Sequence, residues 1–129
     1  MGIALADKAA EYGADVVLVL GPVNRMPGNR SVKVINVISA ESMATECVAR
    51  FPVCDIAILA AAVADFSPEK VEERKIKRTG DEIILKLKPT KDIAETLGRM
   101  KKKSQILAGF AIETHNETAN AKAKLVRKK

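Results

Sequence analysis

An acidic residue and a basic cluster follow closely behind an apolar, strand-like run in this chain. The run ends in the residues AAAVAD, which close on Asp65, and the cluster KIKR (residues 75–78) begins about ten residues later. In open parallel sheets, ligands bind beyond the carboxyl ends of the strands, where small residues let a flat ring approach the backbone. A carboxylate there can accept hydrogen bonds from sugar hydroxyls, and lysines can neutralise phosphate. The pattern therefore predicts a nucleotide site at which phosphate chemistry takes place.

Composition predicts one globular domain, residues 1–129, because 47% of the 129 residues are apolar and 29% are charged. The net charge of +6 is concentrated in residues 74–78, 101–103 and 122–129. Basic clusters of this kind bind nucleic acid, anionic lipid or polyphosphate, or simply form a solvated face. Aromatic residues make up only 3% of the chain, which disfavours base stacking on single-stranded nucleic acid. We interpret residues 101–103 as a helix end, where cations complement the dipole.

Cys47 and Cys54 are separated by six residues, and the chain has one His. This spacing fits neither a zinc site nor a disulfide framework, so we expect reduced core cysteines and no metal site built from protein ligands. No apolar run reaches the ~18 residues of a membrane span, and no signal segment is evident. We therefore expect a cytoplasmic protein without a membrane partner.

Helical and strand-like patterns alternate along the chain. Buried-strand patterns cover residues 15–21, 32–37, 55–63 and 105–112, and helical patterns cover 3–12, 39–50, 90–100 and a segment from 114 onward. We expect Ser39 and Thr90 to cap the second and third helices. The alternation predicts an α/β fold with a Rossmann-like, doubly wound, mainly parallel sheet.

Residues 74–88 follow a different pattern. Two segments, 74–78 and 82–88, flank a Thr79-Gly80 turn, and Ile83, Leu85 and Leu87 alternate with mostly charged neighbours. This arrangement predicts a β-hairpin flap with one solvated face, projecting from the main sheet. Its exposed edge invites pairing with another chain.

The two ends of the chain lack elements that doubly wound folds usually contain. The sequence opens inside a helical pattern with no strand before it and closes on Arg127-Lys128-Lys129. We expect a complete domain of this class to extend further in both directions, so that residues 1–129 form a domain truncated at both ends.

Seven segments in order carry a resemblance to a known family: MGIALADKAAEYGADVVLVLGPV, VISAESM, AAAVADFSPE, KIKR, GDEIILKLKPTKDI, GFAIET and KAKLVRKK. With them the chain resembles the phosphopantothenoylcysteine synthetases (phosphopantothenate–cysteine ligases), the C-terminal half of the bacterial bifunctional coenzyme A biosynthesis protein. The resemblance implies a ligase that joins 4′-phosphopantothenate to cysteine through an acyl nucleotidylate. It implies a nucleoside triphosphate as co-substrate, CTP as in bacterial members or ATP as in most eukaryotic ones, with Mg²⁺ as cofactor. It also implies a homodimer formed partly through the flap, and we expect no nucleic-acid partner.

The resemblance also assigns site residues. Those that it places at the nucleotide are Ala61, Ala62, Val63, Asp65, Lys75, Phe110, Lys124 and Lys128. Lys75 matches the catalytic lysine, whose ammonium can neutralise charge that develops on the attacked α-phosphate. Lys124 and Lys128 match positions that meet the triphosphate, and their i, i+4 spacing puts both on one helix face. Each of these residues also has a purely structural interpretation. Lys75 would be a solvated lysine of the flap, Asp65 a turn residue and Phe110 a core residue. Residues 61–63 would be tightly packed at a strand end, and residues 124 and 128 would belong to a basic tail.

The chain departs from the family pattern in three places. An upstream asparagine segment and a downstream Asn-Asp pair have no counterpart in these residues, and Lys91 stands where the family commonly has Pro. Three alternatives to the ligase stay open: a nucleotide-binding module without full turnover, an unrelated Rossmann-like protein such as a dehydrogenase domain, and a nucleic-acid binder. The missing G-x-G-x-x-G disfavours the dehydrogenase. The flavin-dependent decarboxylase half of the bifunctional protein is not represented, so we expect no flavin on this chain.

Overall fold

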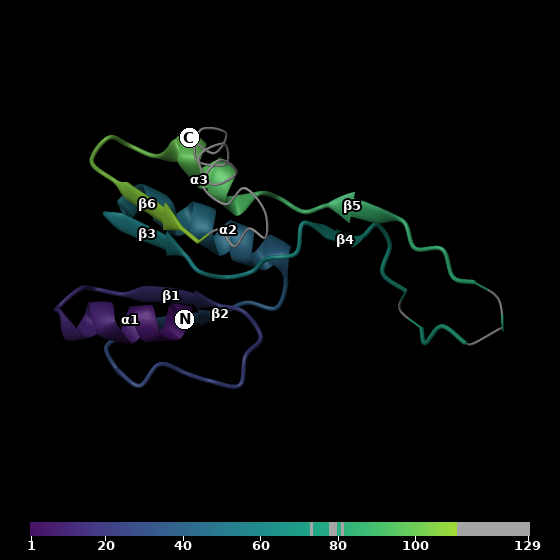
Figure 1. The fold of residues 1–129 in the computed structure, drawn as a ribbon, viewed down its shortest axis with the longest axis horizontal. Coiled ribbons are helices and arrows are strands. Elements are labelled where there is room, and N and C mark those ends of the chain that lie inside the picture. The colour runs from purple at the N-terminus through teal and green to yellow at the C-terminus, as the bar shows by residue number, and fades with distance from the viewer. Residues whose placement is uncertain (73, 78–79, 81, 111–129) are drawn as a thin grey trace, which may run out of the picture.

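A computed structural model describes residues 1–72, 74–77, 80 and 82–110 of the chain (Figure 1). These residues form a mixed α/β body from which a long arm, residues 66–89, projects. The helices are α1 (Gly2–Glu11), α2 (Ala40–Arg50), a short 3₁₀ turn η1 (Phe51–Val53) and α3 (Ile93–Met100). The strands are β1 (Val17–Leu20), β2 (Lys33–Asn36), β3 (Ile56–Leu59), β4 (Phe66–Pro68), β5 (Leu87–Pro89) and β6 (Ile106–Gly109).

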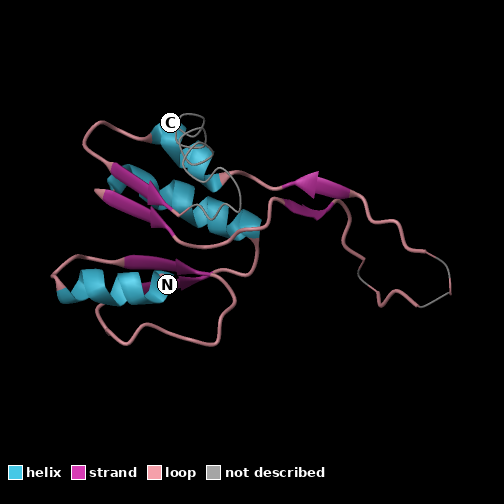
Figure 2. Ribbon diagram, in the orientation of Figure 1, coloured by secondary structure: helices cyan, strands magenta, loops and turns pink. Residues whose placement is uncertain are grey.

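The strands form three pairs (Figure 2). β1 pairs with β2 and β3 pairs with β6, both in parallel, and β4 pairs with β5 in antiparallel register. The expected α/β class with parallel strands and an antiparallel hairpin is therefore confirmed. Within the described ranges, however, the four parallel strands form two separate sheets instead of the expected single one. Among the described residues, β1 and β3 each have one edge without a partner strand, and Ile56 and Ile58 on β3 are 57% and 46% exposed.

A hydrophobic core lies between α2 with η1 and α3. Ser39 caps α2 as expected, because its hydroxyl accepts a hydrogen bond from Ser42 N at 3.1 Å and Ser42 Oγ accepts one from Ser39 N. The buried residues Ala44 and Phe51 then pack against Ile93 and Leu97 of α3. Because α2 also contacts β1, it ties the two parallel pairs into one body.

The start of α3 differs from the expectation. Asp92 caps this helix, since its Oδ1 accepts a hydrogen bond from Glu95 N at 3.0 Å. Thr90 lies two residues earlier, directly after β5, and its hydroxyl donates to the carbonyl of Ala64 instead. An aspartate caps a helix at least as well as a threonine, and the chain becomes helical only after Asp92.

The arm also differs from the predicted hairpin over residues 74–88. Its paired strands lie at the root, where Phe66 pairs with Pro89 and Pro68 with Leu87, and the described residues of 74–86 belong to no strand. A two-stranded hairpin without a packed face is only marginally stable in water, which explains why pairing stays close to the body. Gly80 has a φ of +93°, as expected at a turn.

Candidate functional site

Five of the predicted nucleotide residues follow the ends of β3 and β6: Ala61, Ala62, Val63, Asp65 and Phe110. Leu59 pairs with Gly109 across the parallel ladder, so the segment that begins at Ala60 and the side chain of Phe110 both follow the same edge. Phe110 is 55% exposed, which favours contact with a ligand over a place in the core. This edge therefore presents a backbone segment outside the ladder beside an accessible aromatic ring.

The N-terminus of α1 lies at this edge as well. A Cβ placed on Gly2 would be 3.4 Å from the Cβ of Ala60, which puts the first turn of α1 against the end of β3. That turn contains no acidic residue, and no side chain caps it. Since unpaired N–H groups and the helix dipole favour negative charge, the edge is electrostatically suited to an anion.

Residues 61–65 leave β3 without regular structure. Ala61 and Ala62 are exposed, whereas Val63 is half-buried against the core between α2 and α3. Asp65 is exposed, and among the described residues its carboxylate has no hydrogen-bond or ion-pair partner. The segment thus presents the exposed backbone of Ala61 and Ala62 and the exposed carboxylate of Asp65, while the side chain of Val63 anchors it.

Two hydrogen bonds fix the end of this segment. The N–H of Thr90 donates to the carbonyl of Asp65 at 2.9 Å, and the Thr90 hydroxyl donates to the carbonyl of Ala64 at 2.5 Å. Sequence reasoning missed this contact, because Thr90 has the typical appearance of a helix cap and its partner lies 26 residues away.

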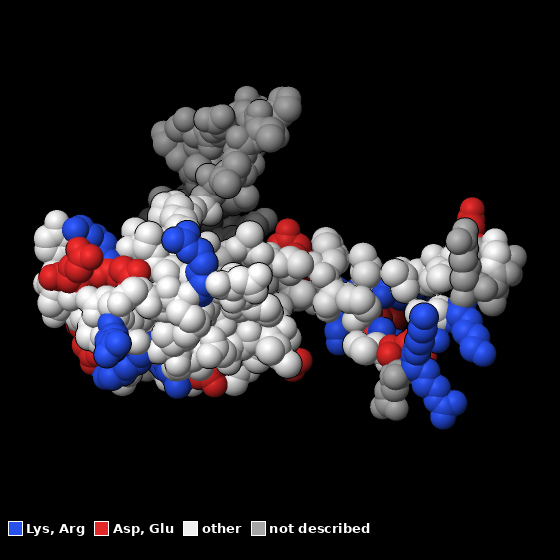
Figure 3. All heavy atoms as spheres, turned by 90° about the horizontal axis from the view of Figure 1, so that it is seen from below, with Lys and Arg blue, Asp and Glu red and all other residues white. Residues whose placement is uncertain are grey.

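Lys75 lies on the arm, away from the segment 61–65. Lys75 and the neighbouring cations Arg74 and Lys77 are exposed, and Figure 3 shows the Lys and Arg side chains that gather on the arm. No contact between described residues brings Lys75 to Asp65 in this conformation. Lys124 and Lys128, the other two predicted phosphate ligands, lie outside the described residues.

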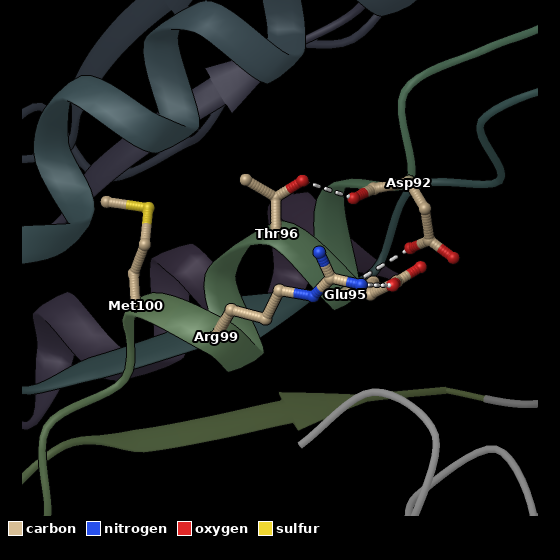
Figure 4. A pocket seen from close by; sticks show the side chains of 5 residues that line it. All are labelled: Asp92, Glu95, Thr96, Arg99 and Met100. Atoms are coloured by element: carbon tan, nitrogen blue, oxygen red, sulfur yellow. Dashed lines mark hydrogen bonds and ion pairs between the residues drawn. The ribbon is translucent and has the colours of Figure 1, made fainter.

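A hollow of about 340 Å³ lies along α3 and was not foreseen from the sequence (Figure 4). Asp92, Glu95, Thr96, Arg99 and Met100 line it. Arg99 forms an ion pair with Glu95, and the Thr96 hydroxyl donates to the Asp92 carbonyl at 2.7 Å. None of the predicted nucleotide residues lines this hollow, and these polar groups stabilise the helix itself.

Burial raises the pKa of the thiols of Cys47 and Cys54, and both cysteines are free. In the part of the chain that the structure describes, no group of three or more His, Cys, Asp or Glu residues is placed to hold a metal ion. The described helices include none that is long and apolar enough to cross a membrane.

The chain is similar in sequence to proteins of a known family. Residues 1–129 match the model of the family described as DNA/pantothenate metabolism flavoprotein C-terminal domain. The coenzyme A biosynthesis bifunctional protein CoaBC of Haemophilus influenzae is 43% identical over 99% of this chain and 32% of its own length. A cysteine/cysteine sulfinic acid decarboxylase of an unknown prokaryotic organism is 56% identical over 99% of this chain and 36% of its own length.

A solved structure extends the likeness to the fold. The C-terminal domain of coenzyme A biosynthesis bifunctional protein CoaBC superposes with a TM-score of 0.84 at 37% identity, over 98% of this chain and 58% of that one. The chain spans about a third of the length of the curated relatives that it matches.

Proposed function

We propose that this chain, which belongs to the DNA/pantothenate metabolism flavoprotein C-terminal domain family, is the phosphopantothenate–cysteine ligase part of a coenzyme A biosynthesis protein. One observation carries the proposal. The segment 61–65 and Phe110, which the family resemblance assigns to the nucleotide, come from different parts of the chain and meet at one edge. The homology to the C-terminal domain of CoaBC supports the same activity.

The proposed reaction has two steps. A carboxylate oxygen of 4′-phosphopantothenate bonds to the α-phosphorus of CTP while the bond to pyrophosphate breaks, which yields an acyl cytidylate. The amine of cysteine then attacks the acyl carbon, loses a proton and displaces CMP, so that an amide forms. Activation is needed because a free carboxylate is a poor acyl donor, whereas CMP leaves readily.

We assign the base and ribose to the edge of β3 and β6. The exposed backbone of Ala61 and Ala62, continued by Val63, can hydrogen-bond the edge of the cytosine ring, and Phe110 can pack against its face. The exposed carboxylate of Asp65 can accept hydrogen bonds from ribose hydroxyls.

We assign the binding of the triphosphate to three lysine side chains. Lys75 is the proposed catalytic residue, and its ammonium would neutralise charge on the α-phosphate and on the acyl cytidylate. Lys124 and Lys128 would bind the rest of the triphosphate. Mg²⁺ enters as a complex with the nucleotide, whose phosphate oxygens are ligands that this cation prefers.

We also propose a homodimer formed through the arm. The arm exposes large apolar side chains, among them Val71, Ile76, Ile83, Ile84 and Leu85, of which Ile84 is 89% exposed. Exposed apolar surface of this extent is typical of a site of protein–protein contact. A second copy of the chain fits, because its own arm carries the same apolar surface and brings a second Lys75.

For the fold, we propose that the two parallel pairs belong to one doubly wound, Rossmann-like sheet. Among the described residues, β1 and β3 each have an edge without a partner strand, and the first turn of α1 lies beside Ala60 at the end of β3, which suits one continuous sheet. We place the protein in the cytoplasm, where free thiols such as Cys47 and Cys54 persist.

Calorimetry and pyrophosphate release test the ligase function. With Mg²⁺ present, we expect CTP to bind more tightly than ATP, and pyrophosphate release to require both CTP and 4′-phosphopantothenate. Release without amide formation after cysteine is added would support a binding module that completes only the first step. The absence of CTP binding would refute the proposal.

A second candidate rests on the relative that is 56% identical, whose name describes a decarboxylase of cysteine or cysteine sulfinic acid. The chain would then be part of a longer protein with that activity. Release of CO₂ from cysteine by a longer protein that contains this chain, without pyrophosphate release, would favour this candidate over the ligase.

A further inference from the structure

We infer that Thr90 is a positioning residue that holds the segment 61–65 in the shape that binds the nucleotide. The inference rests on the proposed function. It starts from the two hydrogen bonds that Thr90 donates, one from the N–H to Asp65 at 2.9 Å and one from the hydroxyl to Ala64 at 2.5 Å.

No other hydrogen bond between described residues fixes the backbone from 61 to 65. Residues 61–64 belong to no helix or strand, and only Val63 packs into the core. A backbone that must present its donors and acceptors to a base needs a fixed conformation, because a mobile one loses conformational entropy on binding. Thr90 supplies the missing constraint at the end of the segment.

The hydroxyl of Thr90 acts differently from the other threonine hydroxyls that bond to carbonyls. Thr45 donates to Glu41 and Thr96 donates to Asp92, each four residues back on the same helix. Thr90 instead reaches across 26 residues and joins the two ends of the arm. Because Asp92 caps α3, Thr90 is not needed to start that helix.

The position of Thr90 couples two parts of the proposed site. It follows β5, where the arm returns to the body, and its partner Asp65 precedes β4, where the arm leaves. The same two bonds therefore fix the direction of the arm relative to Ala61 and Ala62. Thr90 would thereby also influence where the arm presents Lys75.

The test compares Thr90→Val, which removes the hydroxyl at nearly constant volume, with Thr90→Ser, which keeps it. We expect Thr90→Val to weaken CTP affinity roughly ten-fold in calorimetry, the factor for one hydrogen bond of typical net strength. Thr90→Ser should restore most of the affinity. Amide exchange without nucleotide should be faster over residues 60–69 in Thr90→Val only. The matched control, Thr45→Val, removes a hydroxyl–carbonyl bond on α2 and should leave CTP affinity unchanged.

Three outcomes would overturn the inference. If the wild-type chain binds CTP and Thr90→Val binds it equally well, Thr90 does not position the site and the proposed function stands. Equal weakening by Thr45→Val would show a general loss of stability. A wild-type chain that does not bind CTP would overturn both the proposed function and this role of Thr90.

Discussion

Gln105 donates a hydrogen bond from its side-chain amide to the carbonyl of Phe51 at 2.7 Å, although the two residues are 54 positions apart. The same nitrogen donates to the carbonyl of Cys54 at 2.8 Å, and the amide oxygen accepts from Lys102 N at 2.9 Å. Gln105 is only 5% exposed. It therefore joins the start of β6 to the turn that follows α2, and so fixes where β3 and β6 begin to pair.

Gln105→Leu should destabilise the fold by about 2–3 kcal/mol, because it removes the side-chain partner of the Cys54 carbonyl and of the Lys102 N–H. The carbonyl of Phe51 loses one donor and keeps the N–H of Cys54. Denaturant unfolding measures the loss. Lys102→Ala is the control, since its ammonium bonds to the carbonyl of Pro52 at an exposed site and its removal should cost less than about 0.5 kcal/mol. Similar losses in both variants would contradict a special role for Gln105.

Leu97→Ala should destabilise the protein by about 2–5 kcal/mol. Leu97 is 1% exposed and packs with Phe51 and Ala44 between α2 and α3, so the substitution leaves a cavity. Ile38→Ala, where the side chain is 88% exposed, should change unfolding free energy by no more than about 0.5 kcal/mol. Thermal or denaturant unfolding compares them, and an equal effect would show that the burial of Leu97 does not stabilise the core.

The carboxylate of Asp7 anchors the loop before β2. It accepts hydrogen bonds from Gly28 N at 3.1 Å and Asn29 N at 3.0 Å, and these bonds lower the pKa of Asp7 below its ordinary value of 3.8. A lowered pKa means that the anchor stabilises the loop above pH 3.8 and is lost as pH falls through the folded-state value.

NMR titration of the amide protons of Gly28 and Asn29 checks this dependence on pH. The midpoint of their change in shift should lie below pH 3.8. In Asp7→Asn the step should disappear. A midpoint above 3.8 in the wild-type chain would mean that the two N–H bonds do not stabilise the ionised form.

Lys75→Ala should lower CTP-dependent pyrophosphate release by at least about 100-fold, the usual effect of losing a group that stabilises transition-state charge. Circular dichroism should stay unchanged, because Lys75 is exposed on the arm. Lys77→Ala, also exposed on the arm, is the matched control and should retain most of the activity. Full activity of Lys75→Ala would exclude a catalytic role.

Ile84→Glu should dissociate the proposed homodimer. Ile84 is 89% exposed on the arm, and a charge at this position would have to be buried when a second copy covers it. Val53→Glu introduces the same charge at a residue of η1 that is 88% exposed, and should leave the dimer intact. Analytical ultracentrifugation distinguishes the two variants. A monomeric wild-type protein at high concentration would instead exclude the dimer.

Local signals in the sequence were sufficient for the elements that local contacts determine. Ser39 begins α2 because its cap partner Ser42 is three residues away, and α1 gives way at Gly13, which adopts a φ of +87°. The strand pattern predicted β3 and β6 but overestimated their lengths. A run of apolar residues indicates that a segment is buried. The length of a strand depends also on where its partner strand ends, which the apolar run itself does not show.

Contacts between distant segments were not predictable from such signals. A buried Gln105 and an extended Thr90 look like ordinary polar residues in the sequence, and their partners lie 54 and 26 positions away. For the site, the resemblance assigned Phe110 and the segment 61–65 to one pocket, and the parallel register explains how they meet. It gave no indication that Lys75 lies apart from them.

The contacts that hold the two ends of the arm together allow its length to change. Because Thr90 and Asp65 are joined, and β4 and β5 pair beside them, residues 66–89 form a loop whose two ends are already closed. The entropy of closing a loop grows only with the logarithm of its length, by about 0.6 kcal/mol for each doubling. Insertions or deletions beyond the root would therefore change the reach of the arm while the body folds almost unaffected.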